Sequence, residues 1–142
     1  KHGVDYFFFP PDEFRARIAA DEFVEYEEVY PGRFYGTLKS QVERQLEQQN
    51  ILFDVDVKGG CSLKKYYGER ALFIFVQAPS IEVLRERLVR RGDTSMEEIE
   101  KRVGKAEYEM TFSKFADRVI VNDNLDNAKR ELMLVVEKFL NE

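Results

Sequence analysis

The stretch Ala-Leu-Phe-Ile-Phe-Val at residues 71–76 is apolar at every position. A strand with apolar side chains on both faces is typical of a parallel sheet that is covered on both sides. Residues 51–57 upstream and residues 119–121 downstream have a similar character, with little polar alternation. Amphipathic helical patterns lie between these stretches. The sequence therefore predicts an α/β fold in which helices flank a parallel sheet.

Capping residues mark the helices of this core. Ser80 can cap a helix over residues 81–91, and Ser95 with Glu98 matches a capping box that opens the next helix. Apolar residues recur at helical spacing from Ala128 to Phe139 and predict a last helix. Helices and strands thus alternate along this part of the chain, as a parallel sheet requires.

The first part of the chain is different, since it is rich in aromatic residues and glutamates. Prolines precede an acidic helix start, and an alternating segment ends in the turn signal Pro31-Gly32. Thr37 is expected to cap the helix that follows this hairpin. We expect a strand, a helix, a hairpin and a second helix, at residues 6–9, 12–20, 23–35 and 37–46. The predicted division is a small α+β lobe at residues 1–45 and an α/β core at residues 46–142.

The composition excludes several classes of protein. The chain has 142 residues, of which 44% are hydrophobic and 35% charged, and its formal net charge is −5. Its one cysteine, Cys61, excludes an internally disulfide-bonded scaffold. No apolar run approaches the roughly 20 residues that span a bilayer, and the acidic balance argues against a nucleic-acid coat protein. We therefore expect a cytoplasmic protein with neither nucleic acid nor membrane as a partner.

Two carboxylates, Asp54 and Asp56, stand at the end of the strand predicted at residues 51–57, before Gly59-Gly60. In open parallel sheets, ligands bind outside the carboxyl ends of the strands. An acid at that place can contact a ligand or hold magnesium through water. Polar residues that end a strand beside a glycine turn explain the same pattern, and the residues alone leave both interpretations open.

Four residues of the lobe could recognise a base and its phosphate. A carboxylate such as Glu25 accepts two parallel hydrogen bonds, and guanine offers N1–H and N2–H₂ side by side, whereas adenine has an acceptor at N1. The hydroxyl of Thr37 can donate to guanine O6, and those of Tyr6 and Tyr35 suit phosphate oxygens. A solvated strand face with ordinary aromatic residues is the competing explanation, and it prevails where these residues stand alone.

Arginines surround the loop at residues 92–95, which joins two predicted helices. They are Arg87, Arg90, Arg91 and Arg102. Arginines beside a flexible loop can close on phosphates and stabilise the charge of a moving phosphoryl group. A solvated helix face is the alternative interpretation.

Taken together and in this order, these segments resemble the guanylate kinase family. Each match is weak by itself, but six of them in the correct order and at nearly correct spacing form a specific signal. The resemblance runs along nearly the whole chain. The matching segments are Gly3–Phe8, Glu22–Tyr26, Phe34–Thr37, Asp54–Gly59, the arginines Arg87, Arg91 and Arg102, and Val119–Asp123.

The resemblance implies a P-loop kinase-like sheet with a small GMP-binding lobe and a helical lid at about residues 91–112. It also implies an ATP:GMP phosphotransferase, which converts ATP and GMP into ADP and GDP. Glu25 and Asp56 would then bind the guanine of GMP, with Thr37 at its O6. Tyr6 and Tyr35 would hold the GMP phosphate.

The same resemblance assigns the ATP side. Arg91 and Arg102 would be catalytic and would close over the ATP phosphates, with Arg87 beside them. Asn122 would lie near the adenine. Mg²⁺ would enter with ATP, and Asp54 would contact it through water rather than directly.

The chain departs from the family pattern in two places. It contains no Gly-x-x-x-x-Gly-Lys-Ser/Thr loop, and it lacks the arginine pair that precedes the segment matched by Gly3–Phe8. We expect both in the natural protein upstream of Lys1, and we expect a chain without them to be inactive alone. The second departure is at Gly92. Asp93 follows it directly, whereas the family usually has a threonine between this glycine and the acid.

Two other functions compete with a GMP kinase. One is a non-catalytic guanylate-kinase-like module that binds proteins, which would suit the missing loop but would not need Glu25, Asp56 or the lid arginines. The other is a kinase for a different nucleoside monophosphate, against which Glu25 and Thr37 argue. A homodimer is an assembly that the sequence allows.

Overall fold

A computed structural model describes residues 9–92 and 94–142, and for Val29 the main chain alone. Tyr6, Asp93 and all but Phe9 of the strand expected at residues 6–9 lie outside the described residues. The chain forms two compact units, one ending at Gly68 and the other beginning at Glu69. The predicted division into a lobe and a core, between residues 45 and 46, stays a prediction.

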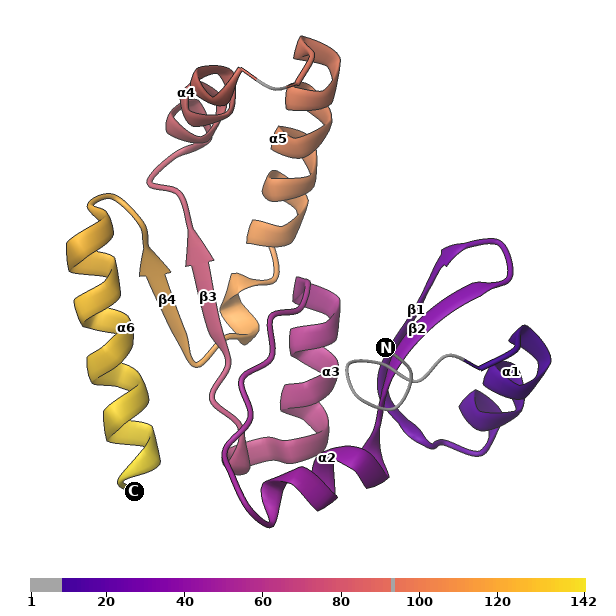
Figure 1. Cartoon of the computed structure of the whole chain (residues 1–142). Helices are drawn as coiled ribbons and strands as arrows, with labels where there is room; N and C mark the ends of the chain where they lie inside the picture. The colour runs from indigo at the N-terminus through magenta and orange to yellow at the C-terminus, as the bar shows by residue number, and fades with distance from the viewer. Residues whose placement is uncertain (1–8, 93) are drawn as a thin grey trace. The chain divides into compact units, whose positions relative to one another are not determined.

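The first unit combines an antiparallel hairpin with three helices (Figure 1). The hairpin expected at residues 23–35 is confirmed, and its second strand continues to Leu38. Its turn contains Gly32 at a φ of 76°, and the amide of Gly32 donates to Glu28 Oε1 at 2.9 Å. The elements are α1 (Pro11–Ala19), β1 (Phe23–Tyr30), β2 (Arg33–Leu38), α2 (Lys39–Leu46) and α3 (Val57–Tyr67).

The role expected of Thr37 as a helix cap is wrong. Leu38 is the N-cap of α2, and no side chain caps that helix. Thr37 lies within β2, where its hydroxyl donates to Glu25 on β1. Glu25 lies directly opposite Thr37 in the hairpin. The Thr37 hydroxyl therefore makes its hydrogen bond across the two strands and not to an amide at the start of α2.

Aromatic side chains form the core between α1 and the hairpin. Phe14 of α1 is 1% exposed and stacks on Phe23 at 4.3 Å and on Phe34 at 4.9 Å between ring centroids. Leu38 completes this buried cluster. Aromatic residues that are spread along this part of the sequence therefore supply the packing that fixes α1 on the hairpin.

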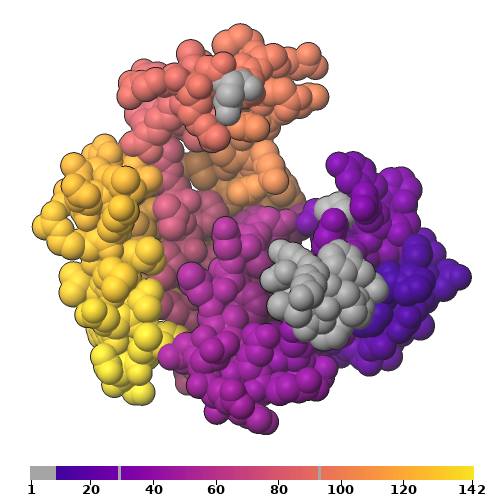
Figure 2. Space-filling model, in the orientation of Figure 1, coloured from indigo at the N-terminus to yellow at the C-terminus, as the bar shows by residue number. Residues whose placement is uncertain are grey.

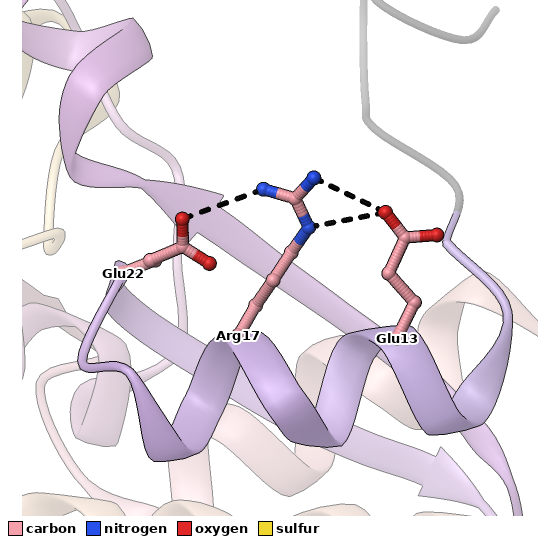
Figure 3. A network of polar contacts seen from close by, with 3 residues as sticks. All are labelled: Glu13, Arg17 and Glu22. Atoms are coloured by element: carbon pink, nitrogen blue, oxygen red, sulfur yellow. Dashed lines mark hydrogen bonds and ion pairs between the residues drawn. The ribbon is translucent and has the colours of Figure 1, made fainter.

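Arg17 ties the exposed side of α1 to the start of β1 (Figure 3). Its guanidinium contacts Glu13 at 3.1 Å and Glu22 at 3.5 Å, and it lies 4.1 Å from the ring centre of Phe9. Ion pairs of this kind at a surface contribute about 0–1 kcal/mol each. The Phe14 cluster, and not this network, therefore dominates the packing of α1.

Gly36 occupies a position in β2 where a side chain has no room. A Cβ at this residue would lie 2.8 Å from the ring of Phe23 and 3.0 Å from that of Phe14. We expect Gly36→Ala to lower the free energy of unfolding by about 1–3 kcal/mol, because overpacking displaces buried rings. Urea denaturation measures the loss. Gly104→Ala is the matched control because its Cβ meets nothing within 4 Å, and an equal loss there would contradict the steric explanation.

The second unit contains a parallel pair of strands and three long helices (Figure 1). In the register of β3 and β4, Ile74 pairs with Arg118 and Gln77 pairs with Val121. This ladder confirms the parallel sheet and the α/β class. The elements are β3 (Ile74–Gln77), α4 (Ile81–Arg91), α5 (Met96–Met110), β4 (Arg118–Val121) and α6 (Leu125–Leu140), with short 3₁₀ turns at Gly68–Arg70 and Ser113–Phe115.

Side-chain caps begin the three helices of this unit. Ser80 accepts from the amide of Val83 and Ser95 from that of Glu98, as expected, and Asn124 accepts from Asn127. The side chains of α6, yellow in Figure 2, are open to view along the helix. Ala128 of this helix is buried. The described residues include no helix with the length and apolarity to cross a membrane.

The strand expected at residues 51–57 is wrong. Residues 51–56 have no regular structure, Leu52 is 94% exposed, and α3 begins at Val57. A strand needs a hydrogen-bonded neighbour, and in the part of the chain that the structure describes the strands pair only as β1–β2 and β3–β4. Gly59-Gly60, interpreted as a turn, lies inside α3.

Candidate functional site

The hairpin brings together three of the residues that the sequence singled out. Glu25 lies directly opposite Thr37, and Glu27 lies directly opposite Tyr35. Residues two apart on a strand share a face with their cross-strand partners, so all four lie on one face of the hairpin. The hydroxyl of Thr37 donates to Oε1 of Glu25 at 2.5 Å, in partly buried surroundings. One carboxylate oxygen of Glu25 is therefore held in place.

Glu25 also lines an open cleft of about 280 Å³ between β1 and the start of α3. Asp56 lines the same cleft, so the first unit places the two predicted guanine-binding carboxylates together. Asp56 is the N-cap of α3, and its Oδ1 accepts from the amide of Gly59 at 2.8 Å. The cleft is lined by Glu25, Tyr26, Glu27, Glu28, Asp56, Lys58, Gly59 and Ser62.

The charges around this cleft are mostly negative. Four carboxylates line it, and Lys58 is the one cation among the described lining residues. Carboxylates of this kind accept hydrogen bonds from paired N–H donors. The amides at the start of α3 add partial positive charge near Asp56 and Lys58. The cleft is therefore suited to a base with adjacent N–H groups.

Sequence reasoning predicted two of the residues that line the cleft as site residues and missed the other six: Tyr26, Glu27, Glu28, Lys58, Gly59 and Ser62. Glu27 could have been found from the alternation of β1, because it lies two residues after Glu25. Lys58 and Ser62 depend on α3, which the pattern did not predict. Asp54 lies outside the cleft lining and is exposed in the irregular stretch before α3.

The second unit places the residues expected around ATP on two helices and a strand end. Arg87 of α4 donates to the main-chain oxygen of Asp123 at 3.4 Å. Asn122 precedes Asp123. The main-chain N–H of Asn122 donates to the carbonyl of Gln77 at 2.8 Å, so the end of β4 lies beside the end of β3. Arg87 and the end of β4 therefore lie close together.

Arg91 and Arg102 come from two helices that pack on each other. Arg91 is the last residue of α4, before Gly92 at a φ of 68°, and Arg102 lies on the exposed side of α5. The seam between these helices is formed by Leu88, Ile99 and Val103, with Ile81 and Leu84 against them. Both arginines are thus carried by one packed helix pair.

A model of the guanylate kinase family matches residues 1–139. The chain belongs to the guanylate kinase family. The guanylate kinase of Bacteroides thetaiotaomicron is 65% identical over 142 residues, which are 99% of this chain and 70% of that protein. That of Porphyromonas gingivalis is 52% identical over 141 residues, 99% of this chain and 75% of that protein. Nothing in these matches supports a non-catalytic interaction module.

The fold agrees with a solved guanylate kinase as well. The crystal structure of the enzyme from Anaplasma phagocytophilum aligns with a TM-score of 0.65 and 27% sequence identity. The alignment covers 97% of this chain and 67% of that chain. The guanylate kinase fold expected from the motifs is therefore confirmed.

The described side chains give little support for other kinds of chemistry. The described residues contain no group of three His, Cys, Asp or Glu side chains that could hold a metal ion. Partial burial raises the pKa of the Cys61 thiol, so this cysteine is protonated near neutral pH and is a poor nucleophile there. The carboxylates and arginines therefore carry the argument about function.

Proposed function

We propose that the protein transfers the terminal phosphoryl group of ATP to GMP, giving ADP and GDP. The observation that carries this proposal is the meeting of Glu25 and Asp56 at one cleft, in a chain of the guanylate kinase family. Glu25 and Asp56 bind guanine. Thr37, which was expected at O6, donates its one hydroxyl hydrogen to Glu25 and so supports that carboxylate instead. Tyr35 lies on the same hairpin face and holds the phosphate together with Tyr6.

The specificity for guanine follows from the hydrogen bonds of Glu25. Thr37 donates to Oε1 of Glu25 and holds that oxygen. The carboxylate then accepts from N1–H and N2–H₂ of the base. Adenine would place a ring acceptor against this negative charge. A site built to pair with such groups discriminates strongly, because a wrong base leaves its polar atoms unpaired.

Phosphoryl transfer needs little covalent help from the protein, because the nucleophile is already a phosphate oxygen. Catalysis then comes from alignment of the reacting atoms and from neutralisation of charge. Arg91 and Arg102 supply positive charge from α4 and α5, and Arg87 adds to it near the end of β4. Asn122, at the same strand end, lies by the adenine of ATP.

The described residues fit a Mg²⁺ ion that is bound together with ATP. Asp54 is an exposed carboxylate, and the described residues include no group of three His, Cys, Asp or Glu side chains that could hold a metal ion, so Asp54 suits a contact through water. Phosphate oxygens of ATP would be the other ligands. When bound, Mg²⁺ would neutralise part of the negative charge on the phosphates of ATP.

Calorimetric titration of the full-length protein tests the guanine site. We expect saturable heat with GMP and none with AMP at the same concentration, because only guanine satisfies Glu25. Equal binding of the two nucleotides would remove the specificity argument. Absence of binding to GMP would overturn the proposed function itself.

A further inference from the structure

An ion pair with fork geometry joins the two helices that carry Arg91 and Arg102. Nε of Arg85 on α4 lies 2.9 Å from Oε1 of Glu100 on α5, and the terminal nitrogen NH2 lies 3.4 Å from Oε2. Each nitrogen therefore faces its own carboxylate oxygen. Such a bidentate arrangement fixes direction as well as distance.

Other ion pairs of α5 have a different character. Lys101 lies 3.9 Å from Glu97, and Lys105 lies 3.7 Å from Glu109, and both pairs stay within the helix. They stabilise one helix but do not relate it to its neighbour. Arg85 and Glu100, in contrast, connect α4 with α5. Hydrogen bonding to Glu100, and then its charge, raises the pKa of Arg85 above its usual value.

An apolar seam and a polar contact together hold the two helices against each other. Leu88, Ile99 and Val103 bury surface against one another, but burial of apolar surface is non-directional. A fork with two matched hydrogen bonds adds the missing direction. Glu100 lies on the same helix as Arg102, two residues before it, which is a rise of about 3 Å along the helix axis.

We propose that Arg85 and Glu100 are a positioning pair, which sets the register of α5 on α4 and thereby the distance between Arg91 and Arg102. This inference rests on the proposed function, in which both arginines contact the ATP phosphates. Charge stabilisation in phosphoryl transfer depends on placement, and a displacement of about 1 Å can reduce a rate by about 100-fold. The pair itself touches no substrate.

Because both side chains of the pair are exposed, a role in positioning can be distinguished by experiment from a role in stability. The side chains are 38% and 54% exposed for Arg85 and Glu100, and exposed ion pairs add little to the free energy of unfolding. Their loss should therefore appear in the rate of phosphoryl transfer more than in the melting temperature. A merely structural role would move the melting temperature instead.

The test compares Arg85→Ala, Glu100→Ala and the exchanged pair Arg85→Glu/Glu100→Arg in the full-length protein. We expect each single variant to lose about threefold to fivefold in kcat, the most that an exposed pair of up to about 1 kcal/mol can produce, with KM for GMP within about twofold and little change in melting temperature. The exchanged pair should recover most of this loss, because the two charges meet again. Arg85→Lys keeps the charge without the fork and should fall between these values. Glu97→Ala is the matched control, since it breaks an ion pair within α5 only, and its kcat should not change.

Several outcomes would overturn the positioning role. They are an unchanged kcat in the single variants, a loss of kcat that follows the melting temperature, and an exchanged pair that stays as slow as the single variants. Failure of the proposed function would look different, because the unaltered protein would then not phosphorylate GMP. Arg102→Ala completes the comparison, and it should lose more kcat than Arg85→Ala, since Arg102 acts directly.

Discussion

Glu25→Gln is expected to reduce kcat/KM for GMP by about 100-fold or more. The hydroxyl of Thr37 donates to one oxygen of the Glu25 side chain, so the amide of glutamine turns its oxygen to Thr37. Its NH₂ group then replaces the other oxygen and faces one of the two guanine donors, so a donor opposes a donor. A site with unpaired polar atoms rejects its substrate strongly. Steady-state kinetics over a range of GMP concentrations measure the loss.

Glu27→Gln is the matched control for this variant. Glu27 lies on the same hairpin face as Glu25, opposite Tyr35, and lines the same cleft. The substitution removes the same charge without touching the atoms paired with Thr37, so we expect a change of less than about fivefold. Equal losses in the two variants would show that the net charge of the cleft governs affinity, and would contradict direct recognition by Glu25.

Local signals were sufficient to predict much of the fold. Ser80 and Ser95 cap the helices that they were expected to cap, because a capping hydroxyl and its amide partner are neighbours in the chain. The hairpin around Pro31-Gly32 was predicted in the same way, from a local turn signal. The pairing of Glu25 with Thr37 was not predicted, because the second strand was expected to end at residue 35 and Thr37 to cap the next helix, whereas β2 continues to Leu38.

The errors arose where the outcome depends on distant residues. Whether residues 51–56 form a strand is decided by a partner strand, which no local pattern can reveal. The glycines of α3 favour a turn by propensity, but Leu63 and Tyr67 are buried in this helix and Asp56 caps it, so tertiary packing prevails. The approach of Asp56 to Glu25 requires α3, and for that reason the sequence could predict it only through the family resemblance.

Phe14→Ala is expected to lower the free energy of unfolding of the first unit by about 3–5 kcal/mol. The ring is 1% exposed and stacks between Phe23 and Phe34, so its loss removes buried surface and leaves a cavity on both strands of the hairpin. Leu38 borders the same cluster and follows Thr37 in β2. Loosening of this core therefore also loosens the partner that fixes Glu25.

Hydrogen exchange with mass spectrometry measures this effect by segment. We expect faster exchange in β1 and β2, with little change in β3, β4 and α6, because Phe14 belongs to the first unit alone. Phe14→Leu keeps most of the buried volume and should lose less stability than Phe14→Ala. Uniform loss of protection across both units would contradict this independence. Weaker GMP binding in Phe14→Ala, restored in part by Phe14→Leu, would tie the aromatic core directly to the guanine cleft.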